Sequence, residues 1–528
     1  MLKILKSNLF FFLLLTIVVL SLYGKSISFD FTYHDDNSLI LEKADFLSHI
    51  TNVPKLFLTS CYYSDTSQYY RPILNLSFLL ETTAFGLNTK IYHLTNIMLF
   101  ILALYLMYVF LLKLNLNKTI LKFLILLISV HPILTSCAVW IPARNDTLLA
   151  IFIFSSFIFF IKYLETKSIK SLFLYVLFFT IALFTKETAL IIFILYPIFI
   201  ICFDYKLSKK EIVKNILFFI PIIIIYFCLR NLSVYSINIK YYFDNITVCF
   251  NNFCTGISTY LYKFFIPSDI QIMLYDINLT FKNIIFDSLV LIVLLFLYYK
   301  KILNTKLLLF SIMWFVLCLI STFLLQEYVY LNHRLILSLF AVVLLLTCLI
   351  QNLITRYKII VKYLLLFYVI LFAFCFIYSL NMQDKYKNKY IYLSNAYSDA
   401  PNYRGSIYWL SRLYLENNDF DNARKFLEKA RYGDKHTYES DLALIYYREG
   451  NIDKAEELYN KSIEYGINKA QCYRNLSVIY LKRDNDVNKA LEYARLAVNE
   501  DPYDDGYKQY LQKLTQVYNN LPNEKNHL

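Results

Sequence analysis

The chain has 528 residues, of which 58% are hydrophobic and 17% charged, with only 8 Gly and 10 Pro. No soluble core needs so much apolar surface over this length, so the composition excludes an ordinary soluble protein and indicates an integral membrane protein. We attribute the formal net charge of +13 to basic residues in cytoplasmic loops, as the positive-inside rule predicts. A nucleic-acid-binding patch would instead need basic residues clustered outside the apolar part of the chain. We therefore expect the lipid bilayer, and not nucleic acid, as a partner of the chain.

The first apolar run covers residues 7–23 and follows Lys3 and Lys6. A cleaved signal peptide is the less favoured alternative, because no small-x-small cleavage site stands out and further apolar runs follow. Each later run approaches the ~20 residues that cross about 30 Å of hydrocarbon. These runs lie near 92–112, 119–138, 147–164, 171–185, 188–203, 214–229, 283–299, 307–325, 335–350 and 359–380. Together with the first run they predict an all-α polytopic bundle of about eleven spans.

The distribution of Lys and Arg orients these predicted spans. With a cytoplasmic N-terminus, every short inner loop carries basic residues, as the positive-inside rule requires. Residues 24–91 are then the first outer loop, with interfacial helices within 45–90, and residues 230–282 are the middle outer loop. Residues 246–266 either cross or lie at the interface; we favour the interface, because a crossing puts later basic loops on the wrong side. The odd number of spans places the C-terminal part outside the cytoplasm.

Near residue 384 the apolar runs stop and an internal repeat begins. Large and small residues recur at intervals of about 33 residues, at Tyr414, Tyr446 and Tyr480, at Ala423, Ala455 and Ala490, and at Ala430, Ser462 and Ala497. Small residues let paired helices pack closely and large ones fill the groove between them, which is the tetratricopeptide pattern. A generic helical bundle is the alternative. The sequence thus predicts a membrane domain at 1–383 and a tetratricopeptide-repeat α-solenoid at 384–528, which offers a surface for protein partners.

Two adjacent carboxylates, Asp35 and Asp36, follow the first apolar run. A charge close to a hydrophobic segment is costly unless it serves water, a metal, a partner or a reaction. The pair can supply a general base, or hold a divalent cation on a phosphate-bearing substrate. The alternative is an exposed acidic loop in which Asp36 caps a helix, and the residues alone do not decide between the two.

Other polar residues lie on the same predicted outer side. Arg71 precedes an apolar helix, where its guanidinium either binds a phosphate or a carboxylate or snorkels at the interface. In the stretch HPILTSCAVWIPARND, Arg144 stands at a helix start, a place that favours a phosphate. Asp146 is well placed as an N-cap, and His131 is either functional or a buried histidine with satisfied hydrogen bonds.

Two further outer turns are tight and charged. Lys186 and Glu187 stand between two apolar runs with almost no loop, so they either satisfy each other or reach into a cavity. Glu327 and His333–Arg334 flank the second turn. Several polar outer turns together predict a water-filled cavity open to the outside and to lipid. Such a cavity suits a donor whose phosphate lies at the headgroup level while its tail stays in hydrocarbon.

The order of these pieces resembles the GT-C class of polyprenyl-phosphate-sugar-dependent glycosyltransferases. More closely, FTYHDDNSLI, YYRPILNLSF, YHLTNIMLF, WIPARNDTLLA, FTKETALIIF and the repeats resemble the transmembrane-and-tetratricopeptide-repeat family of O-mannosyltransferase-like proteins and its bacterial relatives. The resemblance implies that Asp35 or Asp36 is the catalytic carboxylate, with any divalent metal at the same pair and no other cofactor expected. The predicted donor-phosphate and substrate-binding residues are Arg71, Arg144, Lys186, Glu187, His131 and Arg334.

The sequence therefore favours an integral membrane glycosyltransferase that moves a sugar from a polyprenyl-phosphate donor to a hydroxyl of a protein or glycan outside the cytoplasm. The alternative is a non-enzymatic, membrane-anchored scaffold whose repeats recruit protein partners. We favour the enzyme, because an anchor needs one span and not many spans with polar outer turns. A transporter is less favoured, since no matching pair of broken helices is evident. A cytosolic nucleotide-driven mechanism has no support, because Walker A and GxGxxG motifs are missing.

Overall fold

The computed structural model describes residues 8–63, 67–234, 246–275, 280–300, 302, 304–323, 329–357, 361–431, 438–502 and 504–519. The regular elements of the described chain are helices, except for the strands β1 (Leu274–Tyr275) and β2 (Val329–Tyr330), which pair antiparallel with Leu274 opposite Tyr330. It divides into two compact units. Unit 1 comprises Met1–Thr32 and Val53–Tyr392, and unit 2 comprises Tyr33–Asn52 and Leu393–Leu528. The chain therefore passes between the units at 32/33, 52/53 and 392/393.

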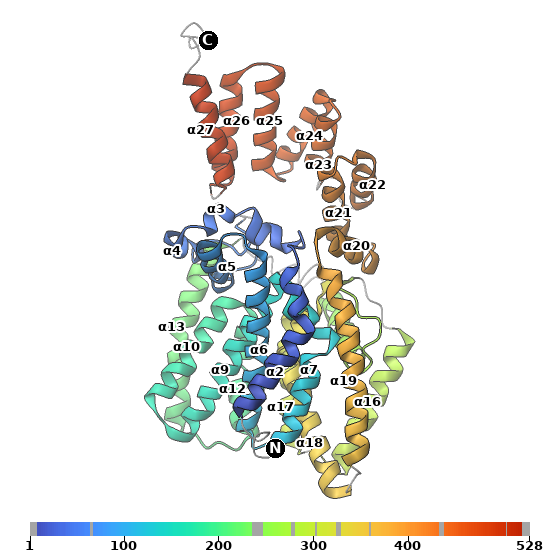
Figure 1. Ribbon diagram of the computed structural model, residues 1–528. Helices are drawn as coiled ribbons and strands as arrows, with labels where there is room; N and C mark the ends of the chain where they lie inside the picture. The colour runs from blue at the N-terminus through green and yellow to red at the C-terminus, as the bar shows by residue number, and fades with distance from the viewer. Residues whose placement is uncertain are drawn as a thin grey trace. The chain divides into compact units, whose positions relative to one another are not determined.

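Unit 1 is a bundle of helices (Figure 1). Its helices are α2 (Asn8–Tyr23), α4 (Val53–Leu56), α5 (Pro72–Phe85), α6 (Thr89–Lys113), α7 (Lys118–Ser129), α8 (Thr135–Val139), α9 (Arg144–Thr166), α10 (Ile169–Thr185), α11 (Thr188–Ile192), α12 (Leu195–Cys202), α13 (Lys209–Ser233), α15 (Ile246–Phe265), α16 (Phe281–Tyr299), α17 (Thr305–Phe323), α18 (Leu339–Tyr357) and α19 (Val361–Gln383). Short 3₁₀ turns join several of them: η1 (Gly24–Ser28), η4 (Pro132–Leu134), η5 (Ile141–Ala143), η6 (Asn332–Leu335) and η7 (Asp384–Tyr386).

Several of these helices are long and apolar enough to cross a membrane. Within the described residues there are five, at Asn8–Ser28, Thr89–Lys113, Ile141–Thr166, Phe281–Tyr299 and Val361–Tyr386. A sixth candidate is the pair Lys118–Ser129 and Pro132–Val139, bent by 61°. The expectation of about eleven spans is therefore wrong.

The physical reason for the difference is that several apolar runs form helices too short to cross a membrane. At Lys186 the backbone turns extended, with φ −158° and ψ 136°, and ends α10 after 17 residues. A 17-residue helix rises only about 25 Å, less than the ~30 Å of hydrocarbon that a span must cross. Helix α15, which holds the segment expected at the interface, is also not among the candidate spans.

Helix α9 lies at the centre of unit 1, and 78% of its most apolar stretch is buried, against 11% for α16 and α19. Trp314 of α17 is fully buried and packs against the rings of Phe110 and Phe340 at 5.7 and 4.3 Å between centroids. Phe154 and Phe157, on α9, contact the same indole. The aromatic side chains thus form one core around the helix that begins with Arg144.

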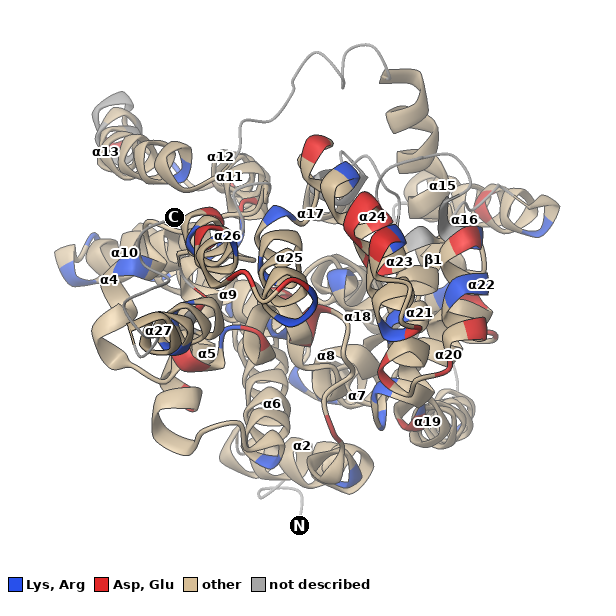
Figure 2. Cartoon of the chain, turned by 90° about the horizontal axis from the view of Figure 1, so that it is seen from above, with Lys and Arg blue, Asp and Glu red and all other residues tan. Residues whose placement is uncertain are grey.

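Unit 2 consists of paired helices in its C-terminal part. These are α21 (Arg404–Glu416) with α22 (Phe420–Arg431), α23 (Glu439–Arg448) with α24 (Ile452–Glu464), and α25 (Lys469–Arg483) with α26 (Val487–Glu500), followed by α27 (Asp505–Asn519). Helix α20 (Lys389–Asp399) precedes these pairs in the sequence, and the boundary between the units falls within it. The N-terminal part of unit 2 contains a π-helical turn, η2 (Asn37–Leu41), α3 (Ala44–Leu47) and η3 (Ile50–Asn52). The paired helices carry both acidic and basic residues (Figure 2).

All three helix pairs turn in the same way. The turn within each pair has one residue in the left-handed conformation, at Asn418 (φ 58°), Gly450 (φ 86°) and Asn485 (φ 51°). Asn and Gly are the residues that adopt this conformation at least cost. The next residue caps the second helix in each pair, as Asp419, Asn451 and Asp486 accept hydrogen bonds from backbone N–H groups three residues later. The third pair therefore shares the turn and cap of the other two.

Candidate functional site

The start of α9 holds a fully buried arginine in unit 1. Arg144 Nη1 donates to Glu81 Oε2 at 2.6 Å, and its Nε donates to Asn96 Oδ1 at 2.7 Å. Its Nη2 donates to the Tyr92 carbonyl at 3.1 Å, and the guanidinium lies 4.8 Å from the Phe78 ring centroid. Arg144 thus ties α9 to α5 and α6. With these donors occupied by the protein, the geometry favours a structural role for Arg144 over direct contact with a phosphate.

Two residues further along α9, Asp146 pairs with two residues from distant parts of the chain. Lys186 Nζ donates to both carboxylate oxygens of Asp146, at 2.8 and 2.9 Å. The Nε2 atom of His333 lies 3.6 Å from Asp146 Oδ2. All three side chains are at most 11% exposed. Asp146 therefore joins α9 to the α10–α11 turn and to η6, and is not the N-cap that the sequence suggested.

A second ion pair lies beside the first. Arg71 Nη2 donates to Glu187 Oε1 at 2.8 Å, and its Nε approaches Oε2 at 3.4 Å. Burial raises the pKa of Glu187, but the charge and hydrogen bonds of Arg71 outweigh it, so the net pKa is below its ordinary value. Asn145 links the two pairs, since its amide accepts from Arg71 Nη1 and donates to the Thr185 carbonyl, both at 3.0 Å, in the orientation that satisfies both neighbours.

Three cations lie close together in the combined cluster. Burial lowers the pKa of Lys186, the attraction of Asp146 raises it, and the nearby charges of Arg71 and Arg334 lower it further. Arg71, Lys186 and Arg334 therefore lie near one another, together with the carboxylates of Asp146 and Glu187. We call Arg71, Asp146, Lys186, Glu187 and Arg334 the cationic cluster. Several cations in one place suit an anion, because opposite charges interact strongly where water is excluded.

The remaining sequence-predicted residues lie elsewhere or have other contacts. Asp35 and Asp36 belong to unit 2, where Asp36 is fully buried at the start of η2 and Asp35 Oδ1 lies 3.1 Å from His34 Nδ1. His131 is buried, stacks on the Phe264 ring and makes a 2.9 Å hydrogen bond with the Phe264 carbonyl. It therefore has the satisfied contacts of a structural histidine. Glu327 lies outside the described residues.

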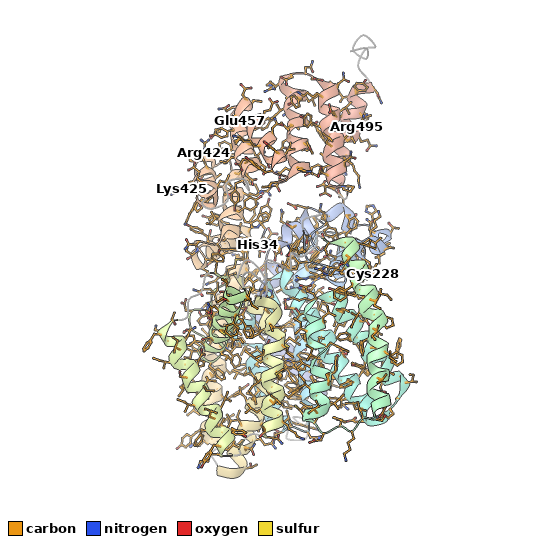
Figure 3. The ribbon with its side chains drawn as sticks, turned by 180° about the vertical axis from the view of Figure 1, so that it is seen from behind. His34, Cys228, Arg424, Lys425, Glu457 and Arg495 are labelled. Atoms are coloured by element: carbon orange, nitrogen blue, oxygen red, sulfur yellow. The ribbon has the colours of Figure 1, made fainter. Side chains whose placement is uncertain are left out.

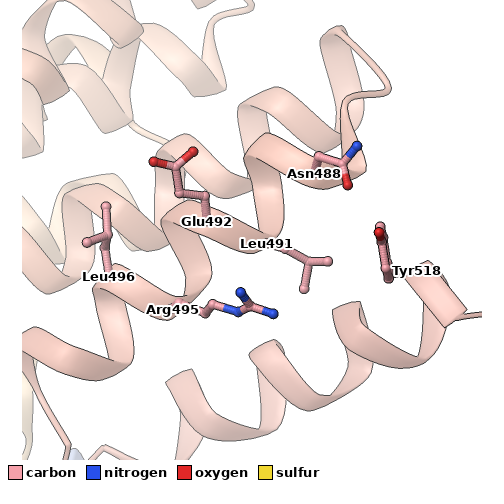
Figure 4. A pocket seen from close by; sticks show the side chains of 6 residues that line it. All are labelled: Asn488, Leu491, Glu492, Arg495, Leu496 and Tyr518. Carbon is pink, nitrogen blue, oxygen red and sulfur yellow. The ribbon is translucent and has the colours of Figure 1, made fainter. Parts of the chain in front are cut away.

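Sequence reasoning missed Glu81 and Asn96, the two side chains that hold Arg144. A signal for Glu81 was present, because one carboxylate in the apolar helix PILNLSFLLETTAF needs a partner. Asn96 offered no comparable signal. Where the structure describes the chain, no three His, Cys, Asp or Glu side chains gather as metal ligands. A groove of about 300 Å³ between α26 and α27 is lined by Leu491, Arg495 and Tyr518 among others (Figure 4).

The comparisons with known proteins concern unit 2 alone. Residues 405–430 and 441–465 match the tetratricopeptide repeat family. These residues coincide with the first two helix pairs, so the prediction of tetratricopeptide repeats is confirmed there. No curated protein and no solved structure is similar enough to match the chain. The fold and comparisons thus define an all-helical protein with several apolar helices that could span a membrane and with C-terminal tetratricopeptide repeats, which are typical of protein-interaction scaffolds.

Proposed function

We propose that the protein is an integral membrane glycosyltransferase that uses a polyprenyl-phosphate-linked sugar, with the cationic cluster as its site for the donor phosphate. The observation that supports this proposal is the convergence of the cations Arg71, Lys186 and Arg334 from remote parts of unit 1. The apolar helices around the cluster would accommodate the isoprenoid tail. A charge in such surroundings is a functional candidate by default, because it is costly to bury.

In the proposed reaction, a hydroxyl oxygen of a protein or glycan attacks the anomeric carbon of the donor sugar. The bond between that carbon and the phosphate oxygen breaks, and the polyprenyl phosphate leaves with the electron pair. Fixed cations near the leaving phosphate stabilise its developing charge, and such electrostatic stabilisation is usually the largest catalytic contribution. The proton of the acceptor hydroxyl passes to a carboxylate, for which the sequence resemblance nominates Asp35 or Asp36. The reaction would occur on the extracytoplasmic side, where sequence analysis places both residues.

The test is transfer of radiolabelled sugar from polyprenyl-phosphate mannose into protein, in membranes that contain the full-length chain. The wild type is compared with Asp35→Asn, Asp36→Asn, the double variant and Lys186→Met. Lys118→Met is the matched control, since it also removes a lysine, from an exposed site at the start of α7. We expect loss of transfer with Lys186→Met and with at least one Asp variant. Undiminished transfer by both Asp variants, singly and combined, rules out this mechanism.

A second candidate function is a non-enzymatic membrane scaffold, and the match to the tetratricopeptide repeat family favours it. It predicts that substitutions in the cationic cluster leave function intact, whereas substitutions on the repeats abolish partner binding. Lys186→Met distinguishes the candidates, because an enzyme loses sugar transfer while a scaffold keeps partner binding.

A further inference from the structure

The most N-terminal residues of unit 2 are separated from the rest of the unit by 340 residues of sequence, since Tyr33–Asn52 groups with Leu393–Leu528. We call Tyr33–Asn52 the brace segment. Both of its ends continue into unit 1. A segment that connects two helices of one unit is not ordinarily expected to pack in another unit. The contacts that hold the brace segment in unit 2 therefore indicate what it does there.

At its beginning, the brace segment contacts the first helix of the first repeat. The rings of Tyr33 and His34 lie edge-on to the Trp409 ring, with centroids 6.0 and 6.2 Å apart, and His34 is labelled in Figure 3. The Tyr33 hydroxyl also donates a hydrogen bond to the Glu416 carboxylate. Trp409 and Glu416 are seven residues apart on α21, so they share one helical face.

At its middle, the brace segment presents an acidic residue and then a basic one. Burial raises the pKa of Glu42, and the positive charge of Arg412, on the same face of α21, opposes that shift. The adjacent Lys43 donates to Asp501 Oδ2 at 2.9 Å, and the Lys43 side chain is only 6% exposed. Asp501 follows the last helix of the third repeat. Lys43 therefore pairs with the residue that follows the third repeat, while Glu42 lies within the electrostatic influence of Arg412 in the first repeat.

This arrangement is unusual for a solenoid. Stacked repeats contact only their sequence neighbours, so the first and third repeats have no direct means of fixing their separation. A segment that binds both ends supplies that constraint. It also contacts Trp409 and Glu416 of α21, so part of that helical face is covered by the chain itself.

We propose that the brace segment is an intramolecular ligand of the tetratricopeptide repeats, which binds α21 through its aromatic residues and Asp501 through Lys43 and so ties the first repeat to the third. The recognition pattern is an aromatic residue followed, nine residues later, by an acidic–basic pair. A protein partner with this pattern would compete with the brace segment. The proposal concerns unit 2 alone and does not depend on glycosyl transfer.

Hydrogen–deuterium exchange of the full-length protein in nanodiscs tests the proposal. We expect the brace segment of the wild type to be protected, and Lys43→Glu to accelerate its exchange on the order of tenfold or more, because a buried ion pair becomes a like-charge contact. The charge swap Lys43→Glu with Asp501→Lys should restore protection. Lys454→Ala is the control, since it removes an exposed ion pair with Glu457 in the second repeat and should leave the brace segment unchanged.

Pulsed electron spin resonance provides a second readout. Spin labels at exposed Lys425 and Arg495 (Figure 3) report the distance between the first and third repeats, in a background with Cys228, Cys254 and Cys348 changed to serine. We expect a narrow distance distribution in the wild type and in the charge swap, and a broader one in Lys43→Glu. Rapid exchange of the brace segment in the wild type, failure of the swap to restore protection, or distributions that do not differ would each overturn the proposal.

Discussion

The buried pair of Arg144 and Glu81 allows a quantitative prediction for unit 1. The Arg144 side chain is fully buried and that of Glu81 is 10% exposed. Arg144→Met leaves Glu81 without its partner, and removal of one partner of a buried pair typically costs about 3–5 kcal/mol. We therefore expect the free energy of unfolding to fall by about that amount.

The double variant Arg144→Met with Glu81→Leu gives the decisive comparison. Replacement of a buried ion pair by apolar groups often leaves protein stability unchanged or raises it. In this protein, however, Asn96 Oδ1 and the Tyr92 carbonyl also lose the hydrogen-bond donor that Arg144 supplies. Each unsatisfied acceptor costs roughly 1–3 kcal/mol. We expect the double variant to be clearly more stable than Arg144→Met. Arg144→Lys keeps the positive charge but loses the planar guanidinium group. Its free energy of unfolding should therefore lie between those of Arg144→Met and the double variant.

Thermal unfolding in detergent, followed with a dye that reacts with exposed thiols, measures these differences. Cys137, Cys318 and Cys375 are buried and become reactive when unit 1 opens. The view that Arg144 acts by pairing with Glu81 would be refuted if Arg144→Met left the free energy of unfolding unchanged. It would also be refuted if the double variant lost as much stability as Arg144→Met and Glu81→Leu lose together.

Three further predictions concern packing, turns and pH. Trp314→Ala should cost about 3–5 kcal/mol in unfolding free energy, measured by the same thiol assay, because it empties the core against Phe340. Gly450→Val should destabilise unit 2 by about 1–2 kcal/mol, seen as faster amide exchange in α23 and α24, because a β-branched residue resists a φ of 86°. Burial raises the pKa of Asp441 above its ordinary 3.8, although Arg412 opposes the shift. The folded state then binds the extra proton, so stability is full below pH 3.8 and falls as pH rises through the raised pKa. The advantage of Asp441→Asn over the wild type should therefore grow from pH 4 to pH 8 in exchange measurements, and an advantage that does not change would contradict the sign.

The sequence predicted periodic features better than it predicted pairings. The recurrence of Tyr414 and Tyr446 placed the repeats correctly, because each repeat packs locally and its pattern is written in neighbouring residues. The number of spans was overestimated, because apolar runs shorter than the ~20 residues of a span were counted as spans. Helix α10, for example, has only 17 residues.

The charged residues illustrate the other limit. The position of Lys186 between two apolar runs indicated that it needs a partner, and Glu187 was the partner considered. Its pairing with Asp146 joins residues 40 apart, and only the packing of α9 against α10 brings them together. The assignment of Tyr33–Asn52 to unit 2 could not be predicted from the sequence either, because no local sequence pattern indicates a contact with Asp501. Whether Asp35 or Asp36 acts as a catalytic carboxylate stays a prediction.

The most direct test of the account is binding of a polyprenyl phosphate to the purified full-length protein in nanodiscs, measured by native mass spectrometry. The cationic cluster predicts that the wild type, Lys186→Arg and the control Lys118→Met retain the lipid, whereas Lys186→Met weakens its binding by about tenfold or more. Equal binding by the wild type and Lys186→Met would contradict the claim that this cluster holds the donor phosphate.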